Sequence, residues 1–122
     1  MARFDRSAFL RELKDAFPEL RATLNAEHGL LHLEMHVFAN FAQHAISVGN
    51  ADAAGICFRI AARYHADGNE SMKNAVVVSF LEHLDLRNAP WAWEMLGDRL
   101  GSEYLRCVDA GVAMPLPYVV SR

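Results

Sequence analysis

Residues 30–48 read LLHLEMHVFANFAQHAISV, and this stretch decides the fold class. Its apolar side chains recur at the spacing of one face of an α-helix, and that row comprises Leu31, Met35, Phe38, Phe41, Ala42, Ala45 and Ile46. The opposite side is polar and includes Asn40, Gln43 and Ser47. An amphipathic helix must bury its apolar row against other elements, so the sequence predicts a long helix within a helical core.

The same periodicity, together with capping residues, predicts further helices on both sides of this stretch. We expect helices over about residues 7–16, from Pro18 to Gly29, over 51–65, 70–84 and 91–96, and from Ser102 to before Gly111, with breaks at Gly97 and Gly101. Asp5 or Ser7, and Asn50 or Asp52, are candidate caps. Short connections make successive helices antiparallel neighbours. We therefore expect one all-α domain over residues 1–122, an antiparallel stack of six or seven short helices.

The run Val76-Val77-Val78 is the one place where a β-strand is arguable. Its flanks keep helical periodicity, so we predict a helix that is apolar nearly all round and therefore buried. Phe58 and Phe80 lie on the apolar rows of their helices and are expected in the core. His83 follows Val76 and Phe80 on one row, which predicts a hydrogen-bonded histidine in the core.

Composition excludes several function classes. The chain has 12 Lys+Arg against 15 Asp+Glu and a net charge of -3, with no basic block, so we expect no nucleic-acid partner. Its apolar stretches end well before the roughly 18 residues that a membrane span needs. The first six residues carry charges where a signal peptide is apolar, which predicts a cytoplasmic protein. Cys57 and Cys107 form no CxxC pair; we expect reduced thiols, with Cys57 in the core.

One helical hairpin has the residue pattern of a helical repeat. Large and small residues alternate at the packing offsets of a tetratricopeptide unit, and they are Phe38, Phe41, Ala42, Ala45, Ala54, Phe58 and Ala61. The match stops one period later, where Asn88 occupies a small-residue position. We expect repeat-like hairpins of tetratricopeptide or HEAT type, with a true repeat protein as the alternative.

A second resemblance covers most of the chain. Its motifs are Phe17-Pro18-Glu19-Leu20, Leu30-Leu31-His32, Val78-Ser79-Phe80-Leu81-Glu82 and Leu100-Gly101. As a set they resemble a family of small bacterial helical proteins described only as a domain of unknown function. In size, and in lacking catalytic signatures, members of that family resemble immunity proteins. The resemblance therefore implies a protein that neutralises a toxin by binding it.

The histidines suggest a metal site as an alternative function. His32 and His36 share one face of the long helix, but zinc needs a third ligand, and Leu33 stands where a metalloprotease has Glu. We interpret them as exposed polar side chains, with a small-ligand or metal site at His32 and His36 as the alternative. Glu82, His83 and Asp85, with His65 as a further candidate, suggest an acid–base cluster, but adjacent residues diverge on a helix. We expect no catalytic residue, no enzyme and no cofactor.

The second half of the chain carries the residues predicted to bind a partner. Four acidic residues stand against one base between Asp67 and Asp85, two tryptophans follow Pro90, and the tail contains Tyr118. Tryptophan is over-represented at binding hot spots, and acidic surfaces steer basic partners. We predict a non-catalytic protein-binding module, with a toxin as candidate partner. Its binding residues would be Glu82, Asp85, Trp91, Trp93 and Tyr118, and the apolar tail could also join two copies.

Overall fold

The computed structural model describes residues 4–26 and 30–109, and every regular element in these ranges is helical. In chain order the elements are α1 (Arg6–Ala16), a 3-10 turn η1 (Pro18–Leu20), α2 (Arg21–Asn25), α3 (Leu31–Ser47), α4 (Ala51–Asp67), α5 (Glu70–Ala75), a π-helical turn η2 (Val76–Phe80), a 3-10 turn η3 (Leu81–His83), α6 (Pro90–Met95) and α7 (Gly97–Asp109). The predicted all-α fold is confirmed. The described residues contain no strand, at the valine run or elsewhere.

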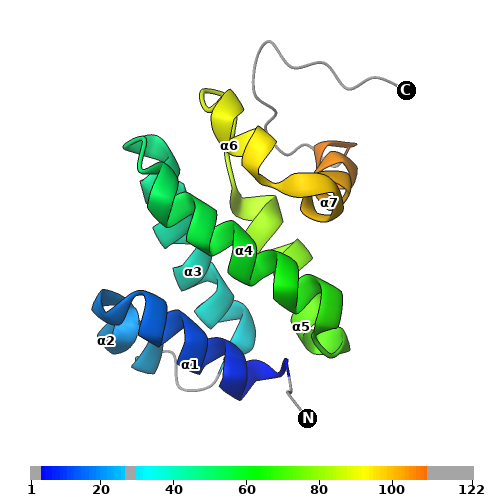
Figure 1. The fold of residues 1–122 in the computed structure, drawn as a ribbon. Coiled ribbons are helices and arrows are strands. Elements are labelled where there is room, and N and C mark those ends of the chain that lie inside the picture. Colours follow the sequence, from blue (N-terminus) through cyan, green and yellow to red (C-terminus); the bar gives the residue numbers. More distant parts are fainter. Residues whose placement is uncertain (1–3, 27–29, 110–122) are drawn as a thin grey trace.

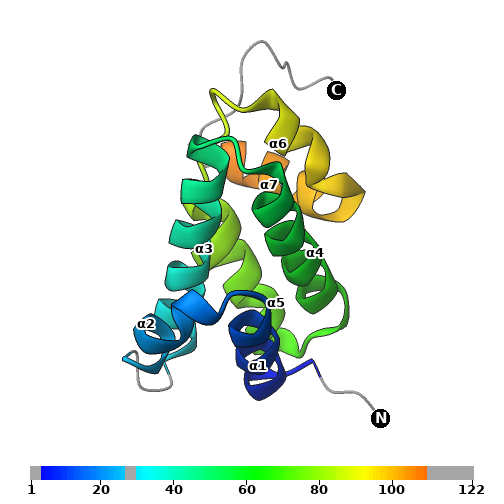
Figure 2. The ribbon, with the colours of Figure 1, turned by 60° about the vertical axis from the view of Figure 1, so that its left-hand side comes forward.

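The long helices α3 and α4 form a hairpin at the centre of the molecule (Figure 1). The segment from α5 to η3 packs beside α3, while α1 and α2 cover one end and α6 and α7 the other (Figure 2). Gly49 turns the chain between α3 and α4 with φ 76°, a left-handed conformation that glycine adopts without strain. Small residues, among them Ala42 and Ala61, are buried in this hairpin. Its repeat-like character stays a prediction.

Side-chain caps start the helices where the sequence indicated. Asp5 accepts a hydrogen bond from the backbone N–H of Ala8 at 3.0 Å, and Asn50 accepts one from Ala53 at 3.1 Å. Each cap satisfies an N–H group that has no partner within the first turn of its helix. No helix in the described part of the chain is long and apolar enough to span a membrane.

A chain of aromatic rings crosses the core. Phe9 of α1 meets Tyr64 of α4 edge-on at 5.4 Å and Phe38 of α3 at 5.5 Å between ring centroids. Phe38 in turn stacks on Phe80 of η2, with centroids 4.6 Å apart and an interplanar angle of 21°. Such pairs stabilise by about 0.5–1.5 kcal/mol beyond the area they bury. The rings thereby connect α1, α3, α4 and η2 through one continuous contact.

Among the residues that the structure describes, the core also contains one charged side chain that the sequence did not reveal. Glu34 of α3 is only 1% exposed, and Arg6 of α1 binds both of its carboxylate oxygens, at 2.8 and 2.7 Å. A buried carboxylate without a partner is strongly destabilising, whereas a two-pronged guanidinium satisfies both oxygens. Arg6 and Glu34 therefore fix how α1 lies across α3.

The prediction that the last helix begins at Ser102 is wrong. Helix α7 begins at Gly97, which has φ 78°, and continues through Gly101. Glycine within a helix costs only about 1 kcal/mol relative to alanine, so burial of the helix can override the break that the sequence suggested. Gly101 is buried beside Trp93. A Cβ added at Gly101 would lie 3.8 Å from a ring carbon of Trp93.

Truncating the core aromatics should test the burial. Phe80 is 0% and Phe58 2% exposed, so Phe80→Ala and Phe58→Ala should each lower the free energy of unfolding by about 3–5 kcal/mol. Urea denaturation measures this loss. Val48, 62% exposed, provides a control, since Val48→Ala should change stability by less than about 0.5 kcal/mol. Losses below about 1 kcal/mol at both phenylalanines would contradict the assigned core.

Two glycines of α7 should respond to alanine in opposite directions. Gly101→Ala should stabilise by about 0.5–1 kcal/mol, because the added Cβ meets Trp93 at ordinary contact distance and the unfolded chain loses freedom. Gly97→Ala should destabilise by about 1 kcal/mol, because φ 78° disfavours a residue with a Cβ. Thermal denaturation of both variants measures the difference. Equal shifts of the same sign would show that the helix start is misplaced.

Candidate functional site

Three side-chain contacts join α3 to the segment from Ser79 to Asp85, and we call this set the polar seam. In chain order the contacts are His32–Ser79, His36–His83 and Gln43–Asp85. The α3 partners lie on one side of that helix because they are spaced four and seven residues apart. The contacts advance in the same direction on both elements, so the second segment runs parallel to α3.

The first contact of the polar seam joins a buried hydroxyl to an exposed imidazole. Ser79 is 3% exposed, and its Oγ lies 2.5 Å from Nδ1 of His32. A serine beside a histidine is the arrangement of an activated nucleophile, but this hydroxyl is closed off from a substrate. The hydrogen bond instead satisfies a buried polar group and fixes the orientation of the His32 ring.

The second contact brings two imidazoles together. Nε2 of His36 lies 2.9 Å from Nε2 of His83, and the ring centroids are 4.1 Å apart at 67°. When both rings are neutral, one donates its Nε2–H and the other accepts, so the two rings hold opposite tautomers. Burial lowers the pKa of His36, and the nearby rings of His83 and His32 lower it further. The arrangement therefore favours a neutral His36.

His83 lies outside the core, and the prediction of a core histidine is wrong. The N–H of Leu81 bonds to the carbonyl of Val76, five residues back, which makes η2 a π-helical turn. The wider turn keeps Val76 and Phe80 on the buried side but rotates the following residues relative to a regular α-helix. His83 thereby leaves the apolar row and reaches His36 on α3.

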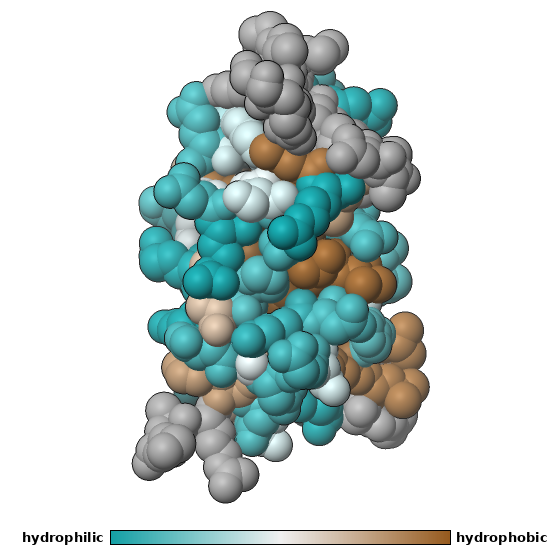
Figure 3. Space-filling view, turned by 90° about the vertical axis from the view of Figure 1, so that its right-hand side faces the viewer, coloured by the Kyte–Doolittle hydropathy of each residue, from teal (hydrophilic) through white to brown (hydrophobic). Residues whose placement is uncertain are grey.

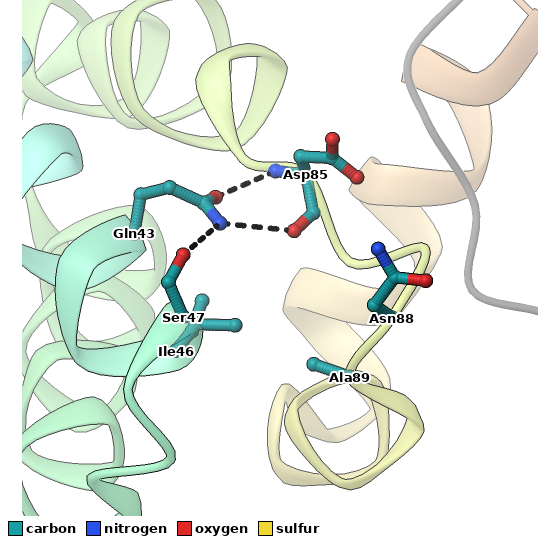
Figure 4. Close-up of a pocket in the computed structure, with 6 residues that line it drawn as sticks. All are labelled: Gln43, Ile46, Ser47, Asp85, Asn88 and Ala89. Atoms are coloured by element: carbon teal, nitrogen blue, oxygen red, sulfur yellow. Dashed lines mark hydrogen bonds between the residues drawn. The ribbon is translucent and has the colours of Figure 1, made fainter.

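The third contact is a clamp on the backbone. The Gln43 side chain accepts a hydrogen bond from the N–H of Asp85 at 2.7 Å and donates to its carbonyl oxygen at 3.1 Å (Figure 4). This clamp forms one wall of a polar pocket of about 260 Å³, which is lined by Gln43, Ile46, Ser47, Asp85, Asn88 and Ala89. The Asp85 carboxylate points away from Gln43 and binds Arg87, whose hydrogen bonds lower the pKa of Asp85.

The structure does not gather the residues predicted to bind a partner into one exposed surface. Glu82 is exposed, whereas Asp85 is half-buried and its charge is paired with Arg87. Trp91 and Trp93 are both half-buried and pack against the core, with Trp93 5.9 Å from the ring of Tyr104. Tyr118 and the C-terminal tail lie outside the described residues.

The sequence indicated the α3 side of the polar seam but not the side formed by residues 79–85. The polar stripe of α3 contained His32, His36 and Gln43, but nothing in the sequence indicated that Ser79 or the backbone of Asp85 would face it. His32 is exposed as expected, whereas His36 is half-buried. A metal site at these two residues stays an alternative, although each ring contacts a different residue of the second segment. Within the described ranges, no three His, Cys, Asp or Glu side chains converge as metal ligands.

His65 belongs to a separate contact. Its Nε2 lies 3.4 Å from a carboxylate oxygen of Glu103 on α7, and its Nδ1 is buried without a hydrogen-bond partner. Burial lowers the pKa of His65, while the Glu103 carboxylate opposes that shift. Both cysteine thiols are free, and burial raises the pKa of Cys57 to about 12, which makes it an inert core residue as predicted.

Acid should destabilise the protein through its histidines. The folded state lowers the pKa of His36 and His65, so below about pH 6.5 the unfolded chain binds more protons than the folded chain. The free energy of unfolding should therefore fall as pH drops from 7 to 5. Urea denaturation across this range measures the slope, which His36→Gln should reduce. Val48→Ala, which changes an exposed position without a titratable group, should keep the wild-type slope.

The polar seam lies wholly within a stretch that is similar to a known family. A protein-family model described as a domain of unknown function, DUF7674, matches residues 10–110. No curated protein and no solved structure matches the chain. The family match begins within α1, extends past the end of α7 and covers most of the chain. The chain therefore belongs to the DUF7674 domain family.

Proposed function

We propose that the chain is a non-catalytic protein-binding module whose contact surface lies around the polar seam. The observation that carries this proposal is the exposure of two large apolar side chains beside its first contact. Leu33 follows His32 on α3 and is 42% exposed, and Val78 precedes Ser79 on η2 and is 40% exposed. Two elements far apart in sequence thus each place an exposed apolar side chain next to a residue of the first contact.

We call the exposed residues in and beside the polar seam the seam face: His32, Leu33, Val78, Glu82 and His83. Leu33 and His36 are three residues apart and so are neighbours on the surface of α3. Apolar side chains that surround fixed polar groups are typical of a binding surface, because little ordering entropy remains to be lost on association. The hydrogen bonds of His32 and His83 supply that fixed geometry.

One face of the molecule is mostly hydrophilic but not uniformly so. Figure 3 shows hydrophobic side chains that reach the surface among hydrophilic ones, on the face that lies to the right in Figure 1. Apolar surface interrupted by charge is a common feature of sites that bind other proteins. Glu82, exposed next to His83, adds a negative charge that would favour a basic partner.

A binding role also agrees with the chemistry of the described residues. Ser79 is the hydroxyl best placed beside a base, and it is buried. Glu82 and His83 are both exposed, but His83 is engaged by His36. In the immunity form of this proposal, the partner is a toxin that the module neutralises by holding it.

Charged substitutions on the seam face should weaken partner binding. The experiment is co-expression with the product of the neighbouring gene, followed by affinity measurement on the purified complex. Leu33→Asp and Val78→Asp should each weaken binding about tenfold or more, because a charge would be buried where apolar surface was covered. Val48→Asp, at the more exposed Val48, is the matched control and should bind like the wild type.

Charge reversal tests the electrostatic part of the same surface. Glu82→Lys should slow association with a basic partner, and added salt should reduce the difference between this variant and the wild type. If the neighbouring product forms a complex that tolerates Leu33→Asp and Val78→Asp, the seam face is not the binding surface. If the co-expressed toxin binds yet remains active, the immunity form of the proposal fails.

A further inference from the structure

Two imidazole nitrogens meet between α3 and η3, one from His36 and one from His83. Their Nε2 atoms are 2.9 Å apart, although the two residues are 47 positions apart in the sequence. The ring centroids are farther apart, at 4.1 Å, so the rings converge toward their Nε2 ends. We propose that His36 and His83 form a two-histidine site for a divalent transition metal ion of the zinc, nickel or copper class.

The geometry of the pair is close to what such an ion requires. Two imidazole nitrogens bound to one Zn²⁺ at about 2.0–2.1 Å and a tetrahedral angle lie about 3.3 Å apart. Opening the pair from 2.9 Å to that separation moves the two Nε2 atoms apart by about 0.4 Å, and aiming both lone pairs at one ion also moves the ring centroids from 4.1 Å to about 5 Å apart, a shift that two side chains can make by rotating about their χ angles. The ring that held its proton on Nε2 would carry it on Nδ1, so that both Nε2 lone pairs face the ion.

The protonation state of His36 is suited to this role. A metal ion binds neutral imidazole, so any group that keeps the ring neutral removes a competing proton. Burial and the neighbouring rings of His83 and His32 lower the pKa of His36. His32 is itself held by Ser79, so it stays beside the pair without joining it.

The surroundings of the pair leave room for further ligands. His36 is half-buried and His83 is exposed, so water can complete the coordination of the ion. No third His, Cys, Asp or Glu joins the pair among the residues that the structure describes. A site with few protein ligands keeps open positions, as catalytic and exchangeable metal sites do, unlike the closed sites that stabilise small folds. Imidazole ligands favour the zinc, copper and nickel class over calcium or magnesium.

Metal binding at this site would also link α3 to η3. The two ligands meet only in the folded chain, so an ion that binds both must stabilise the folded state by mass action. This consequence concerns the isolated chain and does not depend on a protein partner. The metal site and the proposed binding function can therefore succeed or fail separately.

The test is titration of the purified, untagged full chain with Zn²⁺ by calorimetry near neutral pH, with Ni²⁺ as a second probe. The wild type should bind one ion per chain at this site, and the ion should raise the melting temperature. His36→Gln and His83→Gln should each weaken binding by about 100-fold, because each removes one of two ligands held on the same scaffold. His44→Gln keeps the histidine count of these variants but changes an exposed position of α3 outside the polar seam, and it should bind like the wild type.

Circular dichroism of each variant checks that the helical fold is retained. The zinc affinities of His36→Gln and His83→Gln are compared with that of the wild type at equal folded fraction. Absence of saturable binding to the wild type would overturn the proposal. Binding that persists at wild-type affinity in both His36→Gln and His83→Gln would also overturn it, since the ion would then bind elsewhere. A melting temperature that Zn²⁺ leaves unchanged despite binding would contradict a link between α3 and η3.

Discussion

The stacking of Phe38 on Phe80 is the contact on which the rest of the structure depends. Phe38 lies at the centre of α3, and Phe80 ends the π-helical turn that departs from the regular helix. Both rings are fully buried, so their stacking fixes the rotation of η2 relative to α3. With that rotation fixed, Ser79 faces His32 and His83 faces His36. The polar seam thus follows from the way in which an apolar contact orients a distorted helix.

Polar contacts then fix the placement of segments that apolar packing alone does not determine. Arg6 and Glu34 join α1 to α3 in the same region as the edge-on contact of Phe9 with Phe38. A buried ion pair adds little net stability, but breaking one partner is costly, so it disfavours alternative placements of α1. The Gln43 clamp similarly fixes the chain after η3, where no regular helix holds the backbone. These contacts select one arrangement among several that would bury similar apolar area.

In the proposed binding role, the seam face offers a partner the apolar side chains of Leu33 and Val78 and the acidic side chain of Glu82. Its two histidines are held by hydrogen bonds to Ser79 and His36. A metal ion at His36 and His83 would lie within this same surface, beside Leu33. The two proposals therefore concern one face of the DUF7674 domain, although each depends on different side chains. His83 would belong to both the partner-binding surface and the metal site.

The sequence by itself determined the helices, their caps and most of the core. Periodicity located α1, α3 and α4 to within two residues at each end, and it placed Phe58 and Phe80 inside, because burial of apolar rows is a local pattern that residue order records. Only the tertiary structure decided the π-helical turn, the helical path through Gly101 and the burial of Glu34. Two of these depend on a partner distant in sequence, Phe38 for Phe80 and Arg6 for Glu34. The third depends on burial of α7, whose Gly101 lies near Trp93. The candidate site lies in this second category, because its chemistry arises where side chains 42 to 47 residues apart converge.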